Sequence, residues 1–191
     1  MRETTAATYL KDCTLEAHRA TERLLLGDAL RDRQVSPSQY RALILTTARV
    51  WARVGQELEA QAWVSTYAKQ IEGLRQAAAA DAAQFSSLGQ LQQEEDYPPF
   101  ANPSEVLGAM YVLLGSTLGG RMIGRALMAI PALSAAAPFR FYEACGDLPR
   151  GLWPEFKKSL DEDLSQPAQM RAAGERAIST FALYATYYPR G

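Results

Sequence analysis

Histidine is the scarcest chemically versatile residue in this chain: its 191 residues include one, His18. That count excludes a Cys2His2 zinc site, a multi-histidine iron centre and a Ser-His-Asp triad built on any other histidine. Cysteine is nearly as scarce, because Cys13 and Cys145 are too few for a disulfide framework and fit a reducing cytoplasm. We expect both thiols to be buried and unreactive, since Cys13 lies on an apolar helical face and Cys145 has no second histidine to activate it.

An excess of charge is also missing. Lys and Arg total 20 and Asp and Glu total 21, so the formal net charge is −1. Proteins that bind nucleic acids or anionic membranes usually carry a basic excess, so we expect neither partner. The longest uncharged stretch, residues 106–120, is too short and too rich in glycine to span a membrane. The first residues, MRETTAATYLKD, contain no apolar segment typical of a secretion signal. The sequence therefore predicts a cytoplasmic protein.

Apolar residues, in contrast, are plentiful at 48% of the chain, which predicts one domain across residues 1–191 with a sizeable core. Helical periodicity recurs along the sequence, and we find no period-2 strand with hairpin signals. The fold class predicted is all-α. The expected helices cover residues 8–26, 36–58, 64–91, 104–130, 138–145, 149–164 and 167–188. Gly27 and Asp28 end the first helix, Ser36 caps the second, and Ser104 with Glu105 caps the fourth. Residues 96–103 form a proline-rich loop before the fourth helix.

The first expected helix carries one distinctive group of side chains. Lys11, His18 and Glu22 are spaced by seven and four residues and so share one helical face. Glu22 can accept a hydrogen bond from His18 Nδ1–H, which would fix the tautomer and aim the other nitrogen outward, as a metal ligand requires. Lys11 would place a positive charge about 10 Å from His18. The alternative is a surface histidine among solvated charges, which is common on helices.

Four glycines, at positions 115, 119, 120 and 124, interrupt the most apolar helical pattern. Each costs roughly 1 kcal/mol relative to alanine, about 4 kcal/mol together, against a net stability of about 5–15 kcal/mol for a domain. Gly115 and Gly119 share a face, where the missing Cβ atoms would let a flat ligand approach the backbone and the helix kink. The alternative is a close helix–helix contact without any ligand.

Other candidate residues favour structural roles. The acidic run at residues 94–96 is typical of a solvated face. The large aromatic side chains are more typical of a core than of a cofactor site. They are Trp51, Phe141, Trp153, Phe156 and Phe181.

The two motifs together resemble one known family. Residues 10–22, LKDCTLEAHRATE, resemble the proximal helix of heme oxygenases, with its L-K-x-x-T-x-x-x-H-x-x-x-E arrangement. Residues 111–121, YVLLGSTLGGR, are similar to the distal helix of that family, and residues 152–157, LWPEFK, to its penultimate segment. The similarity spans nearly the whole chain in the right order and is strongest to the bacterial branch that includes the heme oxygenases accompanying phytochromes.

This resemblance implies a heme held between the two helices, with His18 as the iron ligand and Glu22 as its hydrogen-bond partner. The residues implied to bind heme are Lys11, His18, Glu22, Tyr111, Gly115, Gly119, Gly120 and Lys157, with the two lysines on the propionates. Those implied to act in catalysis, at the distal face where O2 binds, are Gly115, Ser116 and Gly119. Mammalian members carry an aspartate directly after the first distal glycine, where this chain has Ser116 and where bacterial relatives commonly lack the acid.

The activity implied is cleavage of heme, as substrate and cofactor together, to biliverdin, Fe²⁺ and CO. It would consume O2 and electrons from a separate donor such as ferredoxin or a reductase, and a phytochrome could accept the biliverdin. One alternative is a heme carrier or sensor on the same fold without turnover. A second is a TenA-like thiamin-degrading enzyme, which would need a catalytic cysteine in its pocket.

Overall fold

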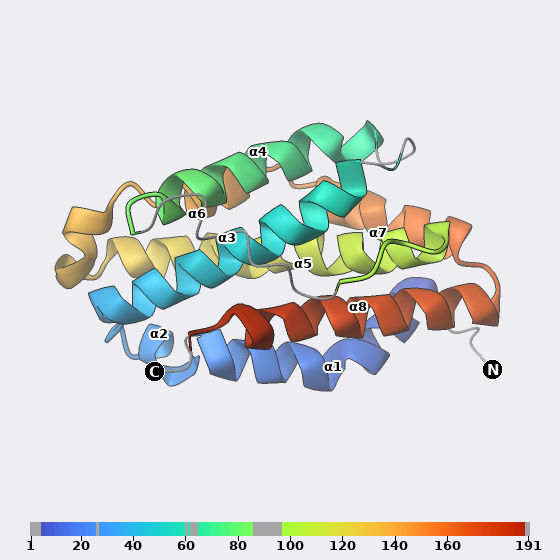
Figure 1. The fold of residues 1–191 in the computed structure, drawn as a ribbon, viewed down its shortest axis with the longest axis horizontal. Helices are drawn as coiled ribbons and strands as arrows, with labels where there is room; N and C mark the ends of the chain where they lie inside the picture. Colours follow the sequence, from blue (N-terminus) through green and yellow to red (C-terminus); the bar gives the residue numbers. More distant parts are fainter. Residues whose placement is uncertain (1–4, 26, 60, 62–64, 86–96, 190–191) are drawn as a thin grey trace.

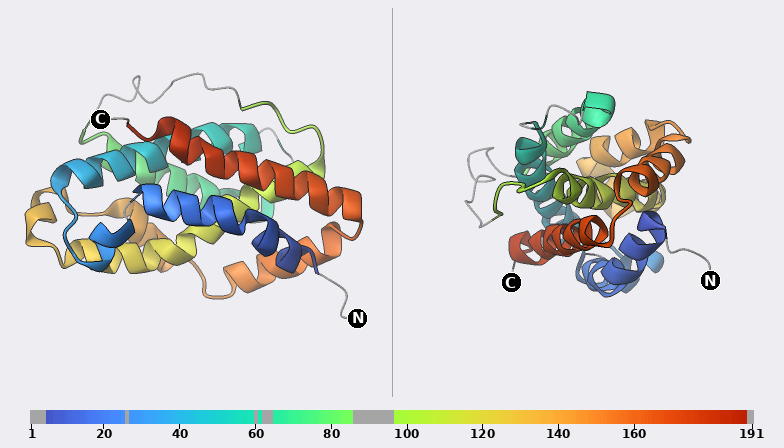
Figure 2. Two further views of the ribbon diagram at one scale, coloured as in Figure 1. Left: turned by 90° about the horizontal axis from the view of Figure 1, so that it is seen from below. Right: turned by 90° about the vertical axis from the view of Figure 1, so that its right-hand side faces the viewer.

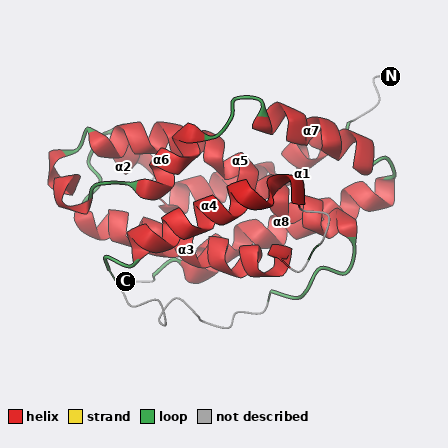
Figure 3. Cartoon of the chain, turned by 90° about the horizontal axis from the view of Figure 1, so that it is seen from above, coloured by secondary structure: helices red, strands yellow, loops and turns green. Residues whose placement is uncertain are grey.

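The structure, a computed structural model, describes residues 5–25, 27–59, 61, 65–85 and 97–189. Within these residues every regular element is a helix, so the all-α prediction is confirmed (Figure 3). The acidic run at 94–96 and the last part of the predicted helix 64–91 lie outside them. The helices are α1 (Ala6–Leu25), α2 (Gly27–Arg31), α3 (Pro37–Glu59), α4 (Ser65–Ala82), α5 (Pro103–Met128), the 3₁₀ helix η3 (Pro131–Ala136), α6 (Arg140–Asp147), α7 (Leu152–Asp163) and α8 (Pro167–Tyr187).

Helices α1, α5 and α8 run in the same direction and form one side of the molecule (Figures 1 and 2). Helix α8 packs against both of the others. No side chain would fit at Gly108 of α5, because the backbone of Ala173 in α8 occupies the space. Helix α1 therefore depends for its position on α8, whose residues come last along the chain.

Helices α3, α4 and α6 cover the other side of α5 (Figure 1). The carboxylate of Asp81 in α4 is fully buried and accepts the backbone N–H groups of Arg140 at 3.1 Å and Phe141 at 3.0 Å. Burial raises the pKa of Asp81, while these two hydrogen bonds act to lower it. Asp81 thus caps the N-terminus of α6 from a different helix, where free N–H groups and the helix dipole favour a negative charge.

The start of α5 differs from the prediction. The cap assigned to Ser104 is wrong: Asn102 is the N-cap, and its side chain accepts the N–H of Glu105 at 3.2 Å. Pro103 occupies the first helical position, where its fixed φ and missing N–H cost nothing, so the helix begins earlier than expected. Ser104 lies inside the helix and is buried. Beyond this start, α5 continues as one uninterrupted helix to Met128, through the glycines at 115, 119, 120 and 124.

Most other boundaries agree with the prediction. Gly27 breaks the first helix with φ at +37°, and Ser36 precedes α3 as its cap, accepting the N–H of Gln39 at 3.2 Å. Within the described residues the third helix ends at Ala82, earlier than expected, and η3 was not anticipated.

Among the described residues, only α5 is long and apolar enough to cross a membrane by length and composition. The mean hydropathy of its most apolar window is 1.4, and 56% of that window is buried inside the fold. Core helices of soluble proteins pass the same test, and α5 occupies such a central position (Figure 1).

Candidate functional site

His18 projects from α1 with its side chain 52% exposed, so it is accessible to a ligand. Its Nδ1 lies 3.5 Å from Oε2 of Glu22, close enough for an ion pair although longer than a typical hydrogen bond. The edge of the Phe181 ring in α8 packs against the imidazole, with ring centroids 5.7 Å apart at 89°. The sequence placed Phe181 in the core, and it is buried there as well as supporting His18.

Tyr184 lies one turn beyond Phe181 on α8 and connects this region to α5. Its hydroxyl shares a hydrogen bond with Ser116, and burial raises its pKa. Ser116 itself donates to the carbonyl of Leu113 at 2.7 Å. The contact between Tyr184 and Ser116 joins α5 to α8, the helix whose Phe181 packs against His18.

A matching pair joins α5 to α1. Tyr111 shares a hydrogen bond with Thr14, whose hydroxyl donates to the carbonyl of Leu10 at 2.6 Å. Burial raises the pKa of Tyr111, and the bond to Thr14 acts to lower it. The ring of Trp153 in α7 lies 5.5 Å from that of Tyr111 and would be 3.3 Å from a Cβ on Gly115. These side chains close one end of the region between α1 and α5.

Beyond that contact the two helices present opposed faces. On α1, His18 and Glu22 follow Thr14 at four and eight residues, so they share its α5-facing side. On α5, Leu118 and Met122 follow Tyr111 at seven and eleven residues and lie within about 20° of it around the helix axis. Both are apolar yet 47% and 73% exposed. The face of α5 turned toward His18 is therefore apolar and uncovered.

The glycines in the second half of α5 divide between two sides of the helix. A Cβ on Gly119, beside Leu118 and Met122, would meet nothing within 4 Å. A Cβ on Gly120 would lie 2.7 Å from Sγ of Cys145, and one on Gly124 would lie 2.8 Å from Cβ of Tyr142. The close helix contact considered from the sequence thus accounts for Gly120 and Gly124, which approach α6. It does not account for Gly119.

Lys11 and Lys157 come from helices that run in opposite directions (Figures 1 and 2). Asp161 of α7 accepts the N–H of Ala7 in α1 at 2.8 Å. Lys11 lies four residues after Ala7 on α1, and Lys157 lies four residues before Asp161 on α7. Both lysines are exposed. The register therefore places two cations at one edge of the region between α1 and α5.

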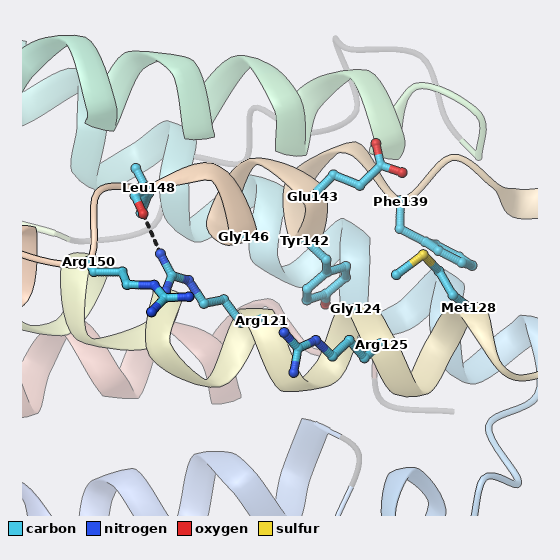
Figure 4. A pocket seen from close by; sticks show the side chains of 10 residues that line it. All are labelled: Arg121, Gly124, Arg125, Met128, Phe139, Tyr142, Glu143, Gly146, Leu148 and Arg150. Carbon is cyan, nitrogen blue, oxygen red and sulfur yellow. Dashed lines mark hydrogen bonds between the residues drawn. The ribbon is translucent and has the colours of Figure 1, made fainter.

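The main cavity lies elsewhere, between α5 and α6, with a volume of about 300 Å³ (Figure 4). A smaller space of about 30 Å³ adjoins Trp153 and Leu118. His18 lines neither of them. No three His, Cys, Asp or Glu side chains among the described residues gather into a metal-binding group.

Neither cysteine is activated as a nucleophile. Cys145 is buried, and this burial raises its pKa to about 12. Cys13 is half-buried between α1 and α8, and desolvation raises its pKa as well. Since the thiolate is the reactive form, a TenA-like mechanism through a catalytic cysteine receives no support.

Comparison with known proteins gives the fold. Among solved structures, heme oxygenase from Leptospira interrogans matches with a TM-score of 0.70 and 18% identity, over 96% of this chain and 98% of that one. No family profile and no curated protein matches the sequence. The chain thus has the heme oxygenase fold, which the resemblance of residues 10–22 and 111–121 implied.

Three residues of this region gave no usable signal in the sequence. Leu118 and Met122 are within an apolar helix, and their exposure depends on where α1 lies. Tyr184 is one of nine tyrosines, and only the contact with Ser116 distinguishes it. The sequence shows only that Leu118 and Met122 share a helical face with Tyr111, and that Tyr184 lies one turn after Phe181.

Proposed function

We propose that this chain is a heme oxygenase that binds heme between α1 and α5 and cleaves it to biliverdin, Fe²⁺ and CO. The observation that carries the proposal is the pairing of His18 with the uncovered apolar face around Gly119. A flat apolar ligand with an iron at its centre requires a side chain that ligates the iron, here His18, and an apolar surface that packs against the ring, here the face of α5 around Gly119. The proposal includes residues 1–191 as a single heme-binding domain in the cytoplasm.

His18 would hold the iron through Nε2. Glu22 lies 3.5 Å from Nδ1, and by accepting from Nδ1–H it would keep the imidazole in the tautomer that ligates and make it a stronger ligand. Phe181 of α8 packs against the imidazole of His18 and restricts its rotation. Heme when bound supplies the redox chemistry with O2, and electrons come from a separate donor such as ferredoxin or a reductase.

The remaining residues would orient the ligand and shape the distal face. Lys11 and Lys157 would pair with the two propionates, and Tyr111 with Gly115 would contact the ring edge near Trp153. Gly119, where a Cβ would meet nothing within 4 Å, would leave room for O2 and a water molecule beside a bound heme. Ser116 is committed to Leu113 and Tyr184, so backbone carbonyls of α5 are the better candidates to hold that water. Gly120 faces Cys145, and this mechanism gives it no contact with heme.

One experiment tests the proposal. Hemin is added to the protein and to an equal concentration of serum albumin, and each sample receives O2 with ferredoxin, its reductase and NADPH. We expect a Soret band, then its loss with release of CO and one biliverdin isomer separable by chromatography. A stable Soret band without pigment would identify a heme carrier or sensor instead. No Soret band would reject heme binding altogether. Transfer of the pigment to an apo-phytochrome tests that partner separately.

A further inference from the structure

A second site is suggested by the cavity of about 300 Å³ between α5 and α6 (Figure 4). Arg121, Arg125 and Arg150 line one end of it, and Phe139 and Met128 line the other. A concave surface of this volume, apolar at one end and with polar groups gathered at the other, is typical of small-molecule sites. The heme mechanism uses none of these five residues.

Arg121 is held rigidly in this cavity. Its Nε donates to the carbonyl of Cys145 at 2.9 Å, and its Nη2 donates to the carbonyl of Leu148. Both carbonyls lie at the C-terminal end of α6, where the helix dipole attracts a cation. Its position is therefore fixed before any ligand arrives.

Arg125 and Arg150 carry charge that the described part of the chain does not neutralise. Both are exposed, and neither forms an ion pair with a carboxylate among the described residues. Glu143, the acid that lines the same cavity, forms no ion pair with any of the three arginines and points away from them in Figure 4. Three like charges around one cavity repel one another, and an anion placed among them would relieve that repulsion.

We propose that this cavity binds a small organic anion, a carboxylate or phosphate attached to an apolar or aromatic body. The anionic group would accept hydrogen bonds from the guanidinium groups, whose planar fork suits two oxygens at once. The apolar body would extend toward Phe139 and Met128. This site uses none of the residues proposed for heme and lies where α5 meets α6.

Phenyl phosphate is a suitable probe, titrated calorimetrically into the apo protein at low salt. We expect saturable binding that weakens with added salt, weaker binding of inorganic phosphate and none of phenol. Arg125→Gln and Arg150→Gln should each weaken phenyl phosphate by about tenfold, the loss of one charge-assisted hydrogen bond. Arg171→Gln removes the same charge from an exposed position on α8 and should leave the affinity within about twofold.

Two further comparisons test whether phenyl phosphate and heme bind at separate sites. Lys11→Gln should leave phenyl phosphate affinity unchanged, and Arg150→Gln should leave the Soret band with hemin unchanged. If Lys11→Gln abolishes phenyl phosphate binding while Arg150→Gln does not, the anion uses the α1–α7 edge and the proposal is wrong. The proposal also fails if phenyl phosphate does not bind below millimolar concentration while an acidic ferredoxin binds in an Arg150-dependent way, since that marks a protein-docking surface. Equal melting temperatures for all variants exclude misfolding as the cause.

Discussion

The two sides of α5 carry the same residue type for opposite reasons. On the α6 side, Gly120 and Gly124 let the helix approach Cys145 and Tyr142 so closely that a Cβ would overlap them. On the α1 side, Gly119 contacts nothing and lies between exposed apolar side chains. One side is therefore closed by packing within the fold, and the other is left open.

This difference shows how finely a helix can divide its functions. Gly119 and Gly120 are neighbours, yet the 100° step between them turns one toward His18 and the other toward α6. The roughly 1 kcal/mol that each glycine costs the helix is recovered by packing at Gly120. At Gly119 no such packing offsets the cost, because a Cβ there would meet nothing within 4 Å.

The largest effect is expected at the open side, from His18→Ala. Loss of the imidazole removes the protein ligand to iron, and we expect turnover to fall to that of free hemin, with a spectrum typical of water-ligated heme. Absorption spectra and pigment yield measure this. Added imidazole, which can enter the space left by the ring, should restore part of the spectrum. An unchanged spectrum and rate would mean that another residue ligates the iron.

Gly119→Leu comes next and separates function from stability. The leucine should displace O2 and its water, so turnover should fall by about 100-fold while the Soret band remains. The apo protein should melt at the same temperature or higher, because leucine is favoured over glycine in a helix by about 1 kcal/mol. If pigment yield is normal and the melting temperature drops, Gly119 serves packing and the distal face has been misplaced.

Gly124→Val should give the opposite pattern. Its Cβ would meet Cβ of Tyr142 at 2.8 Å, and such overpacking typically costs about 1–3 kcal/mol. Denaturant unfolding measures the loss. Gly119→Val is the matched control, with no neighbour to displace and little expected change. Equal destabilisation by the two variants would contradict the division of α5 into a closed and an open side.

Ser116→Ala is expected to cost about 1 kcal/mol of stability, because the buried Tyr184 hydroxyl loses its hydrogen-bond partner. Turnover should change by no more than about threefold, since Ser116 donates to Leu113 rather than to the distal face. The double variant Ser116→Ala with Tyr184→Phe should recover most of the stability, since no polar group is then left unpaired. A turnover loss as large as that of Gly119→Leu would make Ser116 a catalytic residue.

The smallest effect on affinity is expected from Lys11→Ala. An exposed ion pair with a propionate contributes about 0–1 kcal/mol, so heme affinity should weaken by at most about fivefold. The ratio of biliverdin isomers should nevertheless change, because heme could then rotate in its plane. Lys158→Ala, an exposed lysine paired with Glu162 on α7, provides the control. Unchanged affinity together with an unchanged isomer ratio would remove Lys11 from the site.

Local signals in the sequence predicted most of the fold. The capping serine before α3, the glycine after α1 and the prolines around α5 gave boundaries that the structure largely reproduces. The cap of α5 is an exception, because it was predicted at Ser104 and lies at Asn102, with Pro103 in the first helical position.

The candidate site was less predictable, because its parts lie far apart in the chain. The spacing of His18 and Glu22 is local and could be read directly. The separate roles of Gly119 and Gly120 depend on where α6 and α1 pack, which no spacing within α5 reveals. The same holds for Arg150, which follows α6 in the chain and meets Arg121 and Arg125 only through the fold.

The dependence of α1 on α8 has a consequence for how the protein folds. The N-terminal helix packs chiefly on the last helix, and its Ala7 is bonded to Asp161, 154 residues away. Contacts of such long sequence separation form slowly, because a long chain must close before they gain anything. During synthesis α1 emerges before α7 and α8, so its apolar side has no partner until those two helices have been made. The histidine side of the molecule is thus completed only after α8, and a shorter nascent chain cannot hold the same surface together around a ligand.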